Sequence, residues 1–502
     1  MQHLWAGLAA NPALPAEAVG RLLAIDDTEV AWALAERTDL TEQQIPVLAE
    51  RTRTAADDFV ADGRLVAEQV DPARQPHAAL ALLRARQAPV EWAELLIERP
   101  ELWRELAQCP DLPAEPVRRM LADADPEVLA ELAECTTDPE TAAALAAHPS
   151  EQVRQALGFN PAAPSDVLAD LINDRPPLGS CDTCRRHAVP WRHPADCPDP
   201  DCDLPAGAAC DGSHQYARHS ILQAVLGHPA APVADAVRHL DDPSPFLRAQ
   251  LAERPDLHQD AYRRLAADQN LWVLAALAEN PAVGQDLVRR LAAHPHEHVQ
   301  RAAACHPGVP LDVLDRLAAT GRLGNDPLPR IDAADEAELA LLAASANPEL
   351  RRLTALRRDL PAPVRDLLAA DPVAKVAAAV AARPGLGEAR LRAVHARHGR
   401  LAAPGIAANP EAPAGLLREL VAGDHNVATL RALAAHPAAD ATVLTACLRD
   451  KRARRQAAAH PALPVERLRE LLDDPDRVTA AAAAANPALP VTDLLRLMPQ
   501  SR

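Results

Sequence analysis

The amino-acid sequence predicts an all-α repeat protein, because a short motif recurs at a fixed interval, apolar residues follow it at helical spacing, and prolines separate the apolar stretches. The clearest copy of the motif is Asn486-Pro487-Ala-Leu-Pro490, and similar copies begin at Asn11, Asn409 and His460. Its first proline recurs every 26 residues at Pro229, Pro255, Pro281 and Pro307. Repetition at such an interval is typical of stacked supersecondary units.

Each repeat is predicted to contain two short helical segments. Residues 461–486 show both, because an apolar stripe precedes Asp473-Asp474-Pro475 and a second stripe, built from Val478 and alanines, follows it. Proline suits the first turn of a helix, where its missing N–H is not needed, and an asparagine before it can cap free amides. Each motif is therefore expected to begin a helical segment.

The composition and charge fit a repeat array better than a large enzyme. The 502 residues exceed what one core can bury, and with 48% hydrophobic but only 2% aromatic residues, the buried surface must come from Ala, Leu and Val. A net charge of −18 disfavours binding to nucleic acid. No signal segment and no run of 18 apolar residues is present, so we expect a cytoplasmic protein without membrane association.

The repeat pattern resembles the leucine-rich repeat variant family. This resemblance covers most of the chain outside residues 175–216, and it implies a right-handed superhelical solenoid in which each unit pairs an α-helix with a short α- or 3₁₀-helix. HEAT-like helical repeats remain the alternative, because a 3₁₀ segment cannot be distinguished from a short α-helix in the sequence. Residues 39–108 match the pattern worst and are expected to be irregular. The predicted repeat regions are residues 1–174 and 217–502.

A cysteine-rich insertion interrupts one repeat. The motif at Pro161 is followed by the next motif only at Pro229, 68 residues later, and the excess of about 42 residues falls between residues 175 and 216. Five of the nine cysteines lie there, at Cys181, Cys184, Cys197, Cys202 and Cys210. A Cys-x2-Cys turn can direct two thiolates at one metal, and a second pair completes a four-sulfur site. The loop has little apolar material, so metal binding would supply its folding energy.

The spacing leaves the metal open. Four thiolates suit zinc, whereas the resemblance implies a 4Fe-4S cluster, and on that resemblance the ligands are Cys181, Cys184, Cys197 and Cys202. This chain departs from the family type by placing the segment in mid-chain, so both metals stay in play, with the cluster favoured over zinc. Cys210 or His214 could replace the fourth ligand. Two disulfides are a further alternative, which a reducing compartment disfavours.

Several other residues recur with the repeat and are therefore expected to be structural. His228, His306, His436 and His460 alternate with asparagines before the first proline of the motif, which indicates a hydrogen-bonding role in the turn. Cys109 and Cys135 are interpreted as repeat residues of the same kind. The basic residues 449–455 are interpreted as a solvated face.

No glycine-rich phosphate loop, nucleophile elbow or distinctive carboxylate pair is found, and no small-molecule substrate is evident. The sequence therefore favours a non-enzymatic scaffold or adaptor that binds a protein partner and carries one metal centre on its loop. The alternative is an iron-sulfur redox or oxygen sensor whose cluster state changes partner binding.

Overall fold

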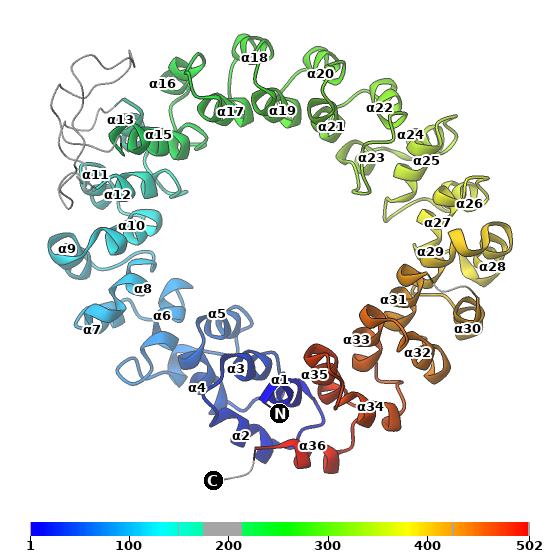
Figure 1. The fold of residues 1–502 in the computed structure, drawn as a ribbon. Coiled ribbons are helices and arrows are strands. Elements are labelled where there is room, and N and C mark those ends of the chain that lie inside the picture. Colours follow the sequence, from blue (N-terminus) through cyan, green and yellow to red (C-terminus); the bar gives the residue numbers. More distant parts are fainter. Residues whose placement is uncertain (1, 149, 174–212, 424–425, 500–502) are drawn as a thin grey trace, which may run out of the picture. The chain divides into compact units, whose positions relative to one another are not determined.

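The structure is a computed structural model that describes residues 2–148, 150–173, 213–423 and 426–499. Within these ranges every regular element is a helix and no strand occurs, which confirms the predicted all-α class (Figure 1). None of the helices in this part of the chain is both long enough and apolar enough to cross a lipid bilayer.

The chain divides into two compact units. The first unit contains Met1–Ala55 and Pro310–Arg502, and the second contains Ala56–Val309. The helices of the first unit are α1 (Gln2–Ala10), α2 (Ala16–Leu23), α3 (Thr28–Ala35), α4 (Gln44–Arg51), α22 (Leu311–Ala318), α23 (Pro329–Asp332), α24 (Glu336–Ala343), α25 (Pro348–Ala355), α26 (Ala362–Ala369), α27 (Ala374–Ala381), α28 (Gly387–His398), η4 (Gly399–Leu401), α29 (Ala403–Ala408), α30 (Ala414–Ala422), α31 (Val427–Ala435), α32 (Ala441–Cys447), α33 (Lys451–Ala459), α34 (Val465–Leu471), α35 (Arg477–Ala485) and α36 (Val491–Leu497).

The helices of the second unit are α5 (Arg53–Ala61), whose first three residues belong to the first unit, η1 (Ala67–Gln69), α6 (Pro76–Arg84), α7 (Trp92–Leu96), η2 (Pro100–Leu102), α8 (Trp103–Ala107), α9 (Ala114–Asp123), α10 (Pro126–Cys135), α11 (Pro139–Ala146), α12 (Glu151–Leu157), α13 (Ser165–Asn173), α15 (Ser213–Leu226), α16 (Val233–Ala236), η3 (Val237–His239), α17 (Pro245–Glu253), α18 (Gln259–Leu265), α19 (Leu271–Glu279), α20 (Gln285–Ala292) and α21 (Glu297–Cys305).

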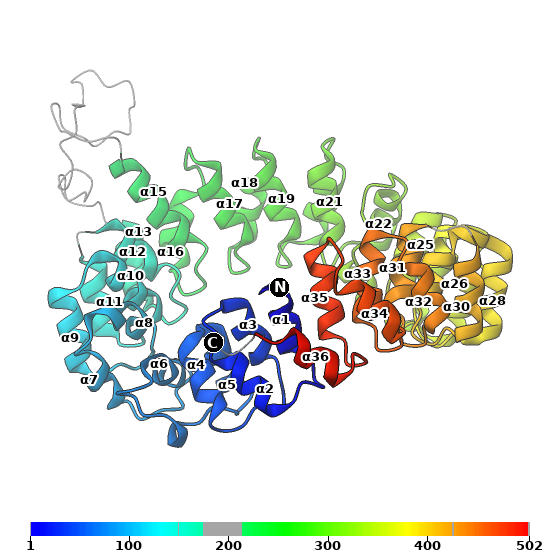
Figure 2. The same cartoon turned by 60° about the horizontal axis from the view of Figure 1, so that its bottom comes forward.

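Most repeats consist of two helices, which we call the A helix and the B helix in chain order. In the second unit each B helix contacts the next one in the series α10, α12, α15, α17, α19 and α21. The A helices form a second layer that packs against these B helices (Figures 1 and 2). Small aliphatic residues fill the space between the layers; Leu277, Ala278 and Ala303, for example, are fully buried. Each repeat thus buries its apolar face largely against its neighbours.

The motif does not begin a helix, contrary to the prediction. Pro487 lies in a turn after α35, and α36 begins only at Val491, with Pro490 as its extended N-cap residue. The asparagine of the motif does cap an amide, because the Asn486 Oδ1 accepts the Ala488 N–H at 2.9 Å, but this amide belongs to the turn. Proline at the N-cap has the extended conformation that this position requires, so the second proline marks the start of the A helix.

Many of the B helices begin at polar caps, and they are α-helical. The Asp450 carboxylate accepts the Arg452 and Ala453 amides at 2.9 Å, and the Asn270 side chain accepts the Trp272 amide at 2.9 Å. The resemblance implies a short α- or 3₁₀-helix in each unit, and in the described residues the 3₁₀ form occurs only at η1 to η4. Alanine has the highest helix propensity of all residues, so alanine-rich segments such as α35 favour the α-helix.

Buried asparagines join consecutive repeats through their side chains. The Asn280 Nδ2 donates to the carbonyl oxygens of Ala252 and Arg254, both at 2.7 Å, and its Oδ1 accepts the Ala282 N–H at 2.9 Å. Asn160, Asn409 and Asn486 make the same set of bonds to the repeat before their own. These bonds satisfy carbonyl groups at the ends of B helices that would otherwise be buried without a donor.

In other repeats, histidine or arginine occupies the position that asparagine has before the motif proline, as His306 and Arg254 do. The His306 Nε2 lies 3.0 Å from the Asn280 carbonyl oxygen, and its Nδ1 accepts the Gly308 N–H at 2.9 Å, so the ring is neutral. His228, His436 and His460 bond in the same manner, which confirms the expected role of these histidines in the turn. Together with the asparagines, these side chains form what we call the inter-repeat ladder.

The ladder also spans the predicted insertion. The His228 Nε2 lies 3.0 Å from the Asn160 carbonyl oxygen although the two residues are 68 positions apart. The helices on either side, α13 and α15, contact each other as the A and B helices of one repeat. Residues 39–108, expected to be irregular, contain α4 to α8 and two 3₁₀ segments, and the helices α7 and α8 are only five residues long.

Within the first unit, the N-terminal helix α1 lies against α35 as if it were the next B helix (Figures 1 and 2). The Asn11 Nδ2 donates to the carbonyl oxygens of Ala484 and Asn486 at 2.8 and 2.7 Å, which is the ladder pattern seen between consecutive repeats. At Gly7 the two helices approach so closely that an added Cβ would collide with the carbonyl oxygen of Ala481. Residues far apart in sequence therefore complete the ladder of this unit.

Candidate functional site

The predicted metal site lies outside the described residues. Cys181, Cys184, Cys197, Cys202 and the alternate ligand Cys210 all belong to residues 174–212, and the other alternate, His214, is in the first turn of α15. In the described ranges, no group of three or more His, Cys, Asp or Glu side chains could hold a metal ion. The metal centre, its ligands and its identity therefore stay predictions from cysteine spacing and from the family resemblance.

A row of aromatic and histidine side chains runs across four consecutive B helices of the second unit. Phe246 on α17 and Trp272 on α19 are exposed by 58% and 65%, although each is followed directly by a fully packed apolar residue. The His219 ring meets Phe246 edge-on at 6.4 Å, and His298 meets Trp272 at 5.2 Å, measured between ring centroids. We call His219, Phe246, Trp272 and His298 the aromatic row.

The helix geometry explains why these four side chains share one face. Phe246, Trp272 and His298 each stand two residues after the N-cap of their helix and are 26 positions apart, so the stacking of repeats places them side by side. The His219 Nε2 lies 2.7 Å from the Ser244 Oγ, and Ser244 is the N-cap residue of α17. Exposed aromatic side chains that gather on one face of a protein often mark a binding site.

Two glutamates lie at the opposite end of the same helices. Glu253 is the last residue of α17 and Glu279 the last of α19, and both are exposed. Partial burial raises the pKa of Glu253 above its ordinary value, and the negative charge of Glu279 adds to this rise. Among the described residues neither carboxylate has a hydrogen-bonding or ion-pairing partner. We call these two residues the acidic pair.

The acidic pair is unfavourable for the local structure. Carboxylates stabilise a helix near its N-terminus, whereas at the C-terminus they face the negative end of the helix dipole. The repulsion between Glu253 and Glu279 adds to this penalty, and neither residue receives the compensating ion pair that Arg248 forms with Asp268 at 2.6 Å on the same repeats. A cation placed between the two carboxylates would remove the repulsion.

The inter-repeat ladder fixes the position of this surface. Arg254, which follows Glu253, is 2% exposed, and its guanidinium donates to the carbonyl oxygens of Leu226 and His228 at 3.0 and 3.2 Å. Asn280, which follows Glu279, bonds to the Ala252 and Arg254 carbonyls. The C-terminal ends of α17 and α19, which carry the acidic pair, are thus joined by hydrogen bonds.

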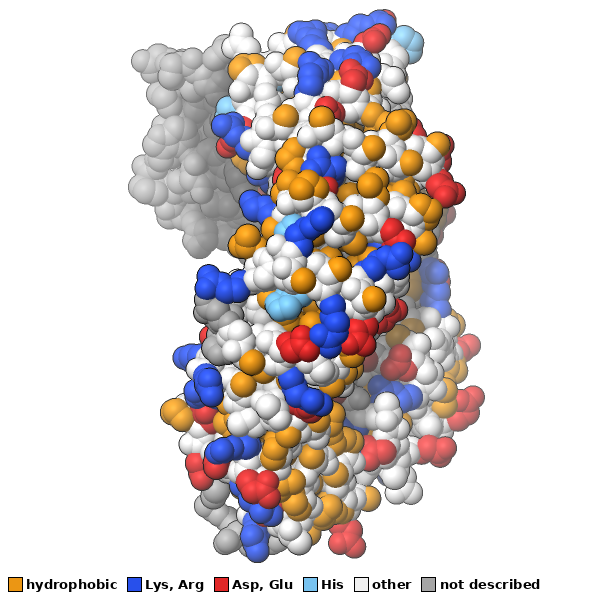
Figure 3. Space-filling model, turned by 90° about the vertical axis from the view of Figure 1, so that its right-hand side faces the viewer, with side chains coloured by type: hydrophobic (Ala, Val, Ile, Leu, Met, Phe, Trp, Pro, Cys, Tyr) orange, Lys and Arg blue, Asp and Glu red, His pale blue; other side chains and the backbone are white. Residues whose placement is uncertain are grey.

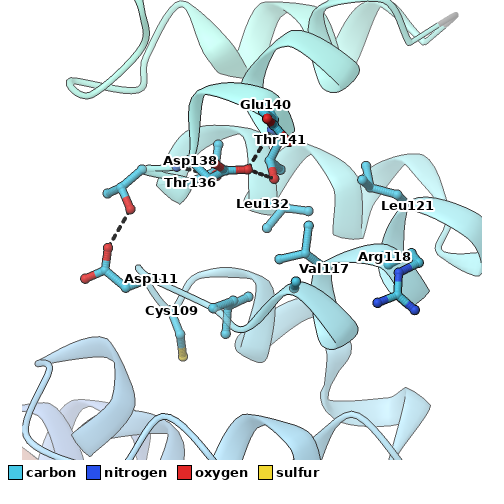
Figure 4. Close-up of a pocket in the computed structure, with 13 residues that line it drawn as sticks. Cys109, Asp111, Val117, Arg118, Leu121, Leu132, Thr136, Asp138, Glu140 and Thr141 are labelled. Carbon is cyan, nitrogen blue, oxygen red and sulfur yellow. Dashed lines mark hydrogen bonds between the residues drawn. The ribbon is translucent and has the colours of Figure 1, made fainter.

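A cavity of about 560 Å³ opens between α9, α10 and α11 (Figure 4). Its polar side chains bond mainly to one another: the Thr137 hydroxyl donates to Asp111 at 2.5 Å and the Thr141 hydroxyl donates to Asp138 at 2.5 Å. The bond from Thr141 holds the pKa of Asp138 below its ordinary value. Cys109, on its wall, is buried with its thiol 3.8 Å from the Leu80 carbonyl oxygen. The cavity is therefore lined in part by the turns between consecutive repeats, and its polar side chains serve to hold those turns.

Two of the basic side chains in residues 449–455 form ion pairs with the following repeat. Arg455 pairs with Asp476 at 2.8 Å and Arg454 with Asp474 at 3.1 Å, so both side chains bridge to the following repeat. On the face drawn in Figure 3, basic and acidic side chains are interspersed among apolar ones over the described residues. This mixture is typical of a solvated surface.

Comparisons with known proteins add no assignment: no family model matches the chain, and no curated protein shows significant similarity to it.

The aromatic row and the acidic pair were missed in the sequence, although a signal was present. Only 2% of the residues are aromatic, and Phe246 and Trp272 are two of them at the same position of consecutive repeats. Each stands directly before a buried Leu247 or Val273, where an apolar residue is not needed for the core. The recurrence of exposed aromatic and acidic residues at equivalent positions of neighbouring repeats is the sequence signal for the aromatic row and the acidic pair.

Proposed function

We propose that this protein is a non-enzymatic helical-repeat scaffold of the solenoid type, and that it binds a protein partner along the B helices of its second unit. The observation that carries this proposal is the exposure of Phe246 and Trp272 at equivalent positions of neighbouring helices. Large aromatic side chains dominate the energetics of protein interfaces. A repeated helical surface offers such side chains at a regular spacing, which suits an extended partner.

The test compares the full chain with the double variant Phe246→Ser/Trp272→Ser. Both positions are exposed, so the variant is expected to keep the circular dichroism and the unfolding midpoint of the wild type. Each chain is immobilised and incubated with an extract of its source cells, and the retained proteins are compared by quantitative mass spectrometry. Proteins that the wild type retains and the variant loses support the proposal.

A matched variant guards against a general effect of surface apolarity. Leu341 on α24 is 69% exposed and lies in the other unit, so Leu341→Ser removes apolar surface of similar exposure elsewhere. Identical sets of retained proteins for the wild type and the Phe246/Trp272 variant would exclude the aromatic row as the binding surface.

The resemblance to the leucine-rich repeat variant family and the metal centre on residues 175–216 are kept as parts of this proposal. They rest on the repeat period and on the spacing of the cysteines. Elemental analysis of the anaerobically purified chain decides between zinc and an iron-sulfur cluster. Stoichiometric zinc in a colourless protein would remove the iron-sulfur sensor alternative, because zinc has no redox chemistry.

A further inference from the structure

The aromatic row and the acidic pair lie on the same two helices, and their spacing restricts what can bind across them. Phe246 precedes Glu253 by seven residues on α17, and Trp272 precedes Glu279 by seven on α19. With a rise of 1.5 Å per residue, the two features are about 10 Å apart along the helix axes. A single extended chain that crosses the helices between them can therefore contact both.

The charge of the site points to a cationic partner. The acidic pair lacks a partner among the described residues, stands at the negative ends of two helices and suffers mutual repulsion. The nearby aromatic faces of Trp272 and Phe246 also favour cations, since arginine and lysine bind over aromatic rings. A protein of net charge −18 attracts a basic segment from a distance as well.

The repeat distance sets the spacing of the cations. Neighbouring packed helices are about 8–10 Å apart. A polyproline II segment advances about 3.1 Å per residue and has three residues per turn, so every third side chain returns to the same face after about 9 Å. Basic residues at every third position of such a segment would meet Glu253 and Glu279 in turn, and the residues between them would lie on the aromatic row.

We infer that the second unit binds an extended, basic segment of a partner protein, in which Arg or Lys recurs at every third residue. Glu253 and Glu279 bind the cations, and Phe246 and Trp272 hold the intervening apolar or proline residues. This inference rests on the proposed scaffold function and names the chemistry of its partner.

The experiment measures the binding of three fluorescein-labelled peptides to the full chain by fluorescence anisotropy. The first peptide contains four Arg-Pro-Ala units, the second has the same composition with its arginines adjacent, and the third has Glu in place of Arg. We expect the wild type to bind the first peptide more tightly than the second and not to bind the third. Binding is expected to weaken with added salt, because exposed charges are screened.

The double variant Glu253→Gln/Glu279→Gln tests the role of the acidic pair. From the usual contribution of exposed ion pairs, the loss of both charges is expected to weaken binding of the first peptide by about fivefold or more. It should also abolish the preference for spaced over adjacent arginines. The control variant Glu17→Gln/Glu29→Gln changes the net charge equally at exposed glutamates of the other unit and should bind like the wild type.

Four results would each overturn the inference. They are no binding of the first peptide, equal binding by the Glu253/Glu279 variant and the wild type, binding of the acidic peptide, and self-association of the chain through Phe246 and Trp272 in sedimentation velocity, which would make a second copy the occupant. Failure of the scaffold proposal is separate. If extract proteins are retained through Phe246 and Trp272 but the basic peptide does not bind, the scaffold function stands and the basic partner is wrong.

Discussion

Replacement of Asn11 by alanine tests whether α1 is held on α35 by the bonds that join consecutive repeats. Asn11 is fully buried, its Nδ2 donates to the Ala484 and Asn486 carbonyls at 2.8 and 2.7 Å, and its Oδ1 accepts the Ala13 N–H at 2.8 Å. Alanine leaves these three backbone groups without their donor or acceptor. With about 1 kcal/mol or somewhat more for each buried group, the contact should weaken by about 3–4 kcal/mol.

Hydrogen exchange measured by mass spectrometry reports this change where it occurs. Stacked repeats can open locally, so a single unfolding midpoint would average the effect. A loss of about 3 kcal/mol corresponds to exchange faster by roughly 100-fold. We expect this increase in both α1 and α35 of Asn11→Ala, although the two helices are separated by more than 450 residues in the sequence.

The matched variant Asn280→Ala removes the three equivalent hydrogen bonds, of which two reach the C-terminal end of α17 and one is donated by the Ala282 amide in the turn after α19. It should accelerate exchange there and leave α1 and α35 unchanged. Faster exchange in α1 of Asn11→Ala with unchanged α35 would refute the reasoning, since α1 would then fray by itself. An effect below about 0.5 kcal/mol in both helices would show that water satisfies the exposed carbonyls equally well.

Three further outcomes are expected. Gly405→Ala should destabilise by about 1–3 kcal/mol in urea unfolding, since its Cβ would strike a backbone oxygen of the preceding repeat, whereas Gly20→Ala, with open space around it, should stabilise by about 0.5–1 kcal/mol. His306→Asn should keep stability at pH 7.5; because burial lowers the pKa of His306, wild-type stability falls below about pH 6.5, and the variant should lose less between pH 6.5 and 5.5 in the same assay. Arg455 lowers the pKa of Asp476 to about 2, so the stabilisation from this pair is present above about pH 4 and is lost as the pH falls towards 2; Arg455→Ala should raise the pKa of Asp476 in an NMR titration, and an unchanged value would contradict the ion pair between the two side chains.

The period and helical class could be predicted because they depend on local patterns. Apolar spacing and polar caps act within one repeat, so the stripes around Leu468 and Val478 predicted α34 and α35 correctly. The interchange of His and Asn before the motif proline likewise predicted a hydrogen-bonding role, since both side chains can donate and accept hydrogen bonds. These inferences required no knowledge of which residues meet across the stack.

The start of the A helix and the contact of α1 with α35 could not be predicted in this way. Asn486 resembles an N-cap locally, but its amide donates to Ala458 and His460 in the preceding repeat, and this long-range bond places its proline in a turn. The contact made by Asn11 spans more than 470 residues and leaves no periodic trace. Both depend on how repeats stack, which the sequence of a single repeat does not specify.

Within one repeat, the buried ladder residue contributes to stability, and the residue just before it is where we propose that the partner binds. In several repeats the buried position after the B helix holds Asn, His or Arg, because each of these side chains can donate to carbonyl oxygens of the preceding repeat. A substitution at this position must keep such a donor. The exposed position just before it has no such constraint. Glutamate at this position in α17 and α19 weakens the helix ends, so local folding does not explain its presence. The cationic partner that we propose would account for it, because a positive charge between Glu253 and Glu279 would offset their mutual repulsion.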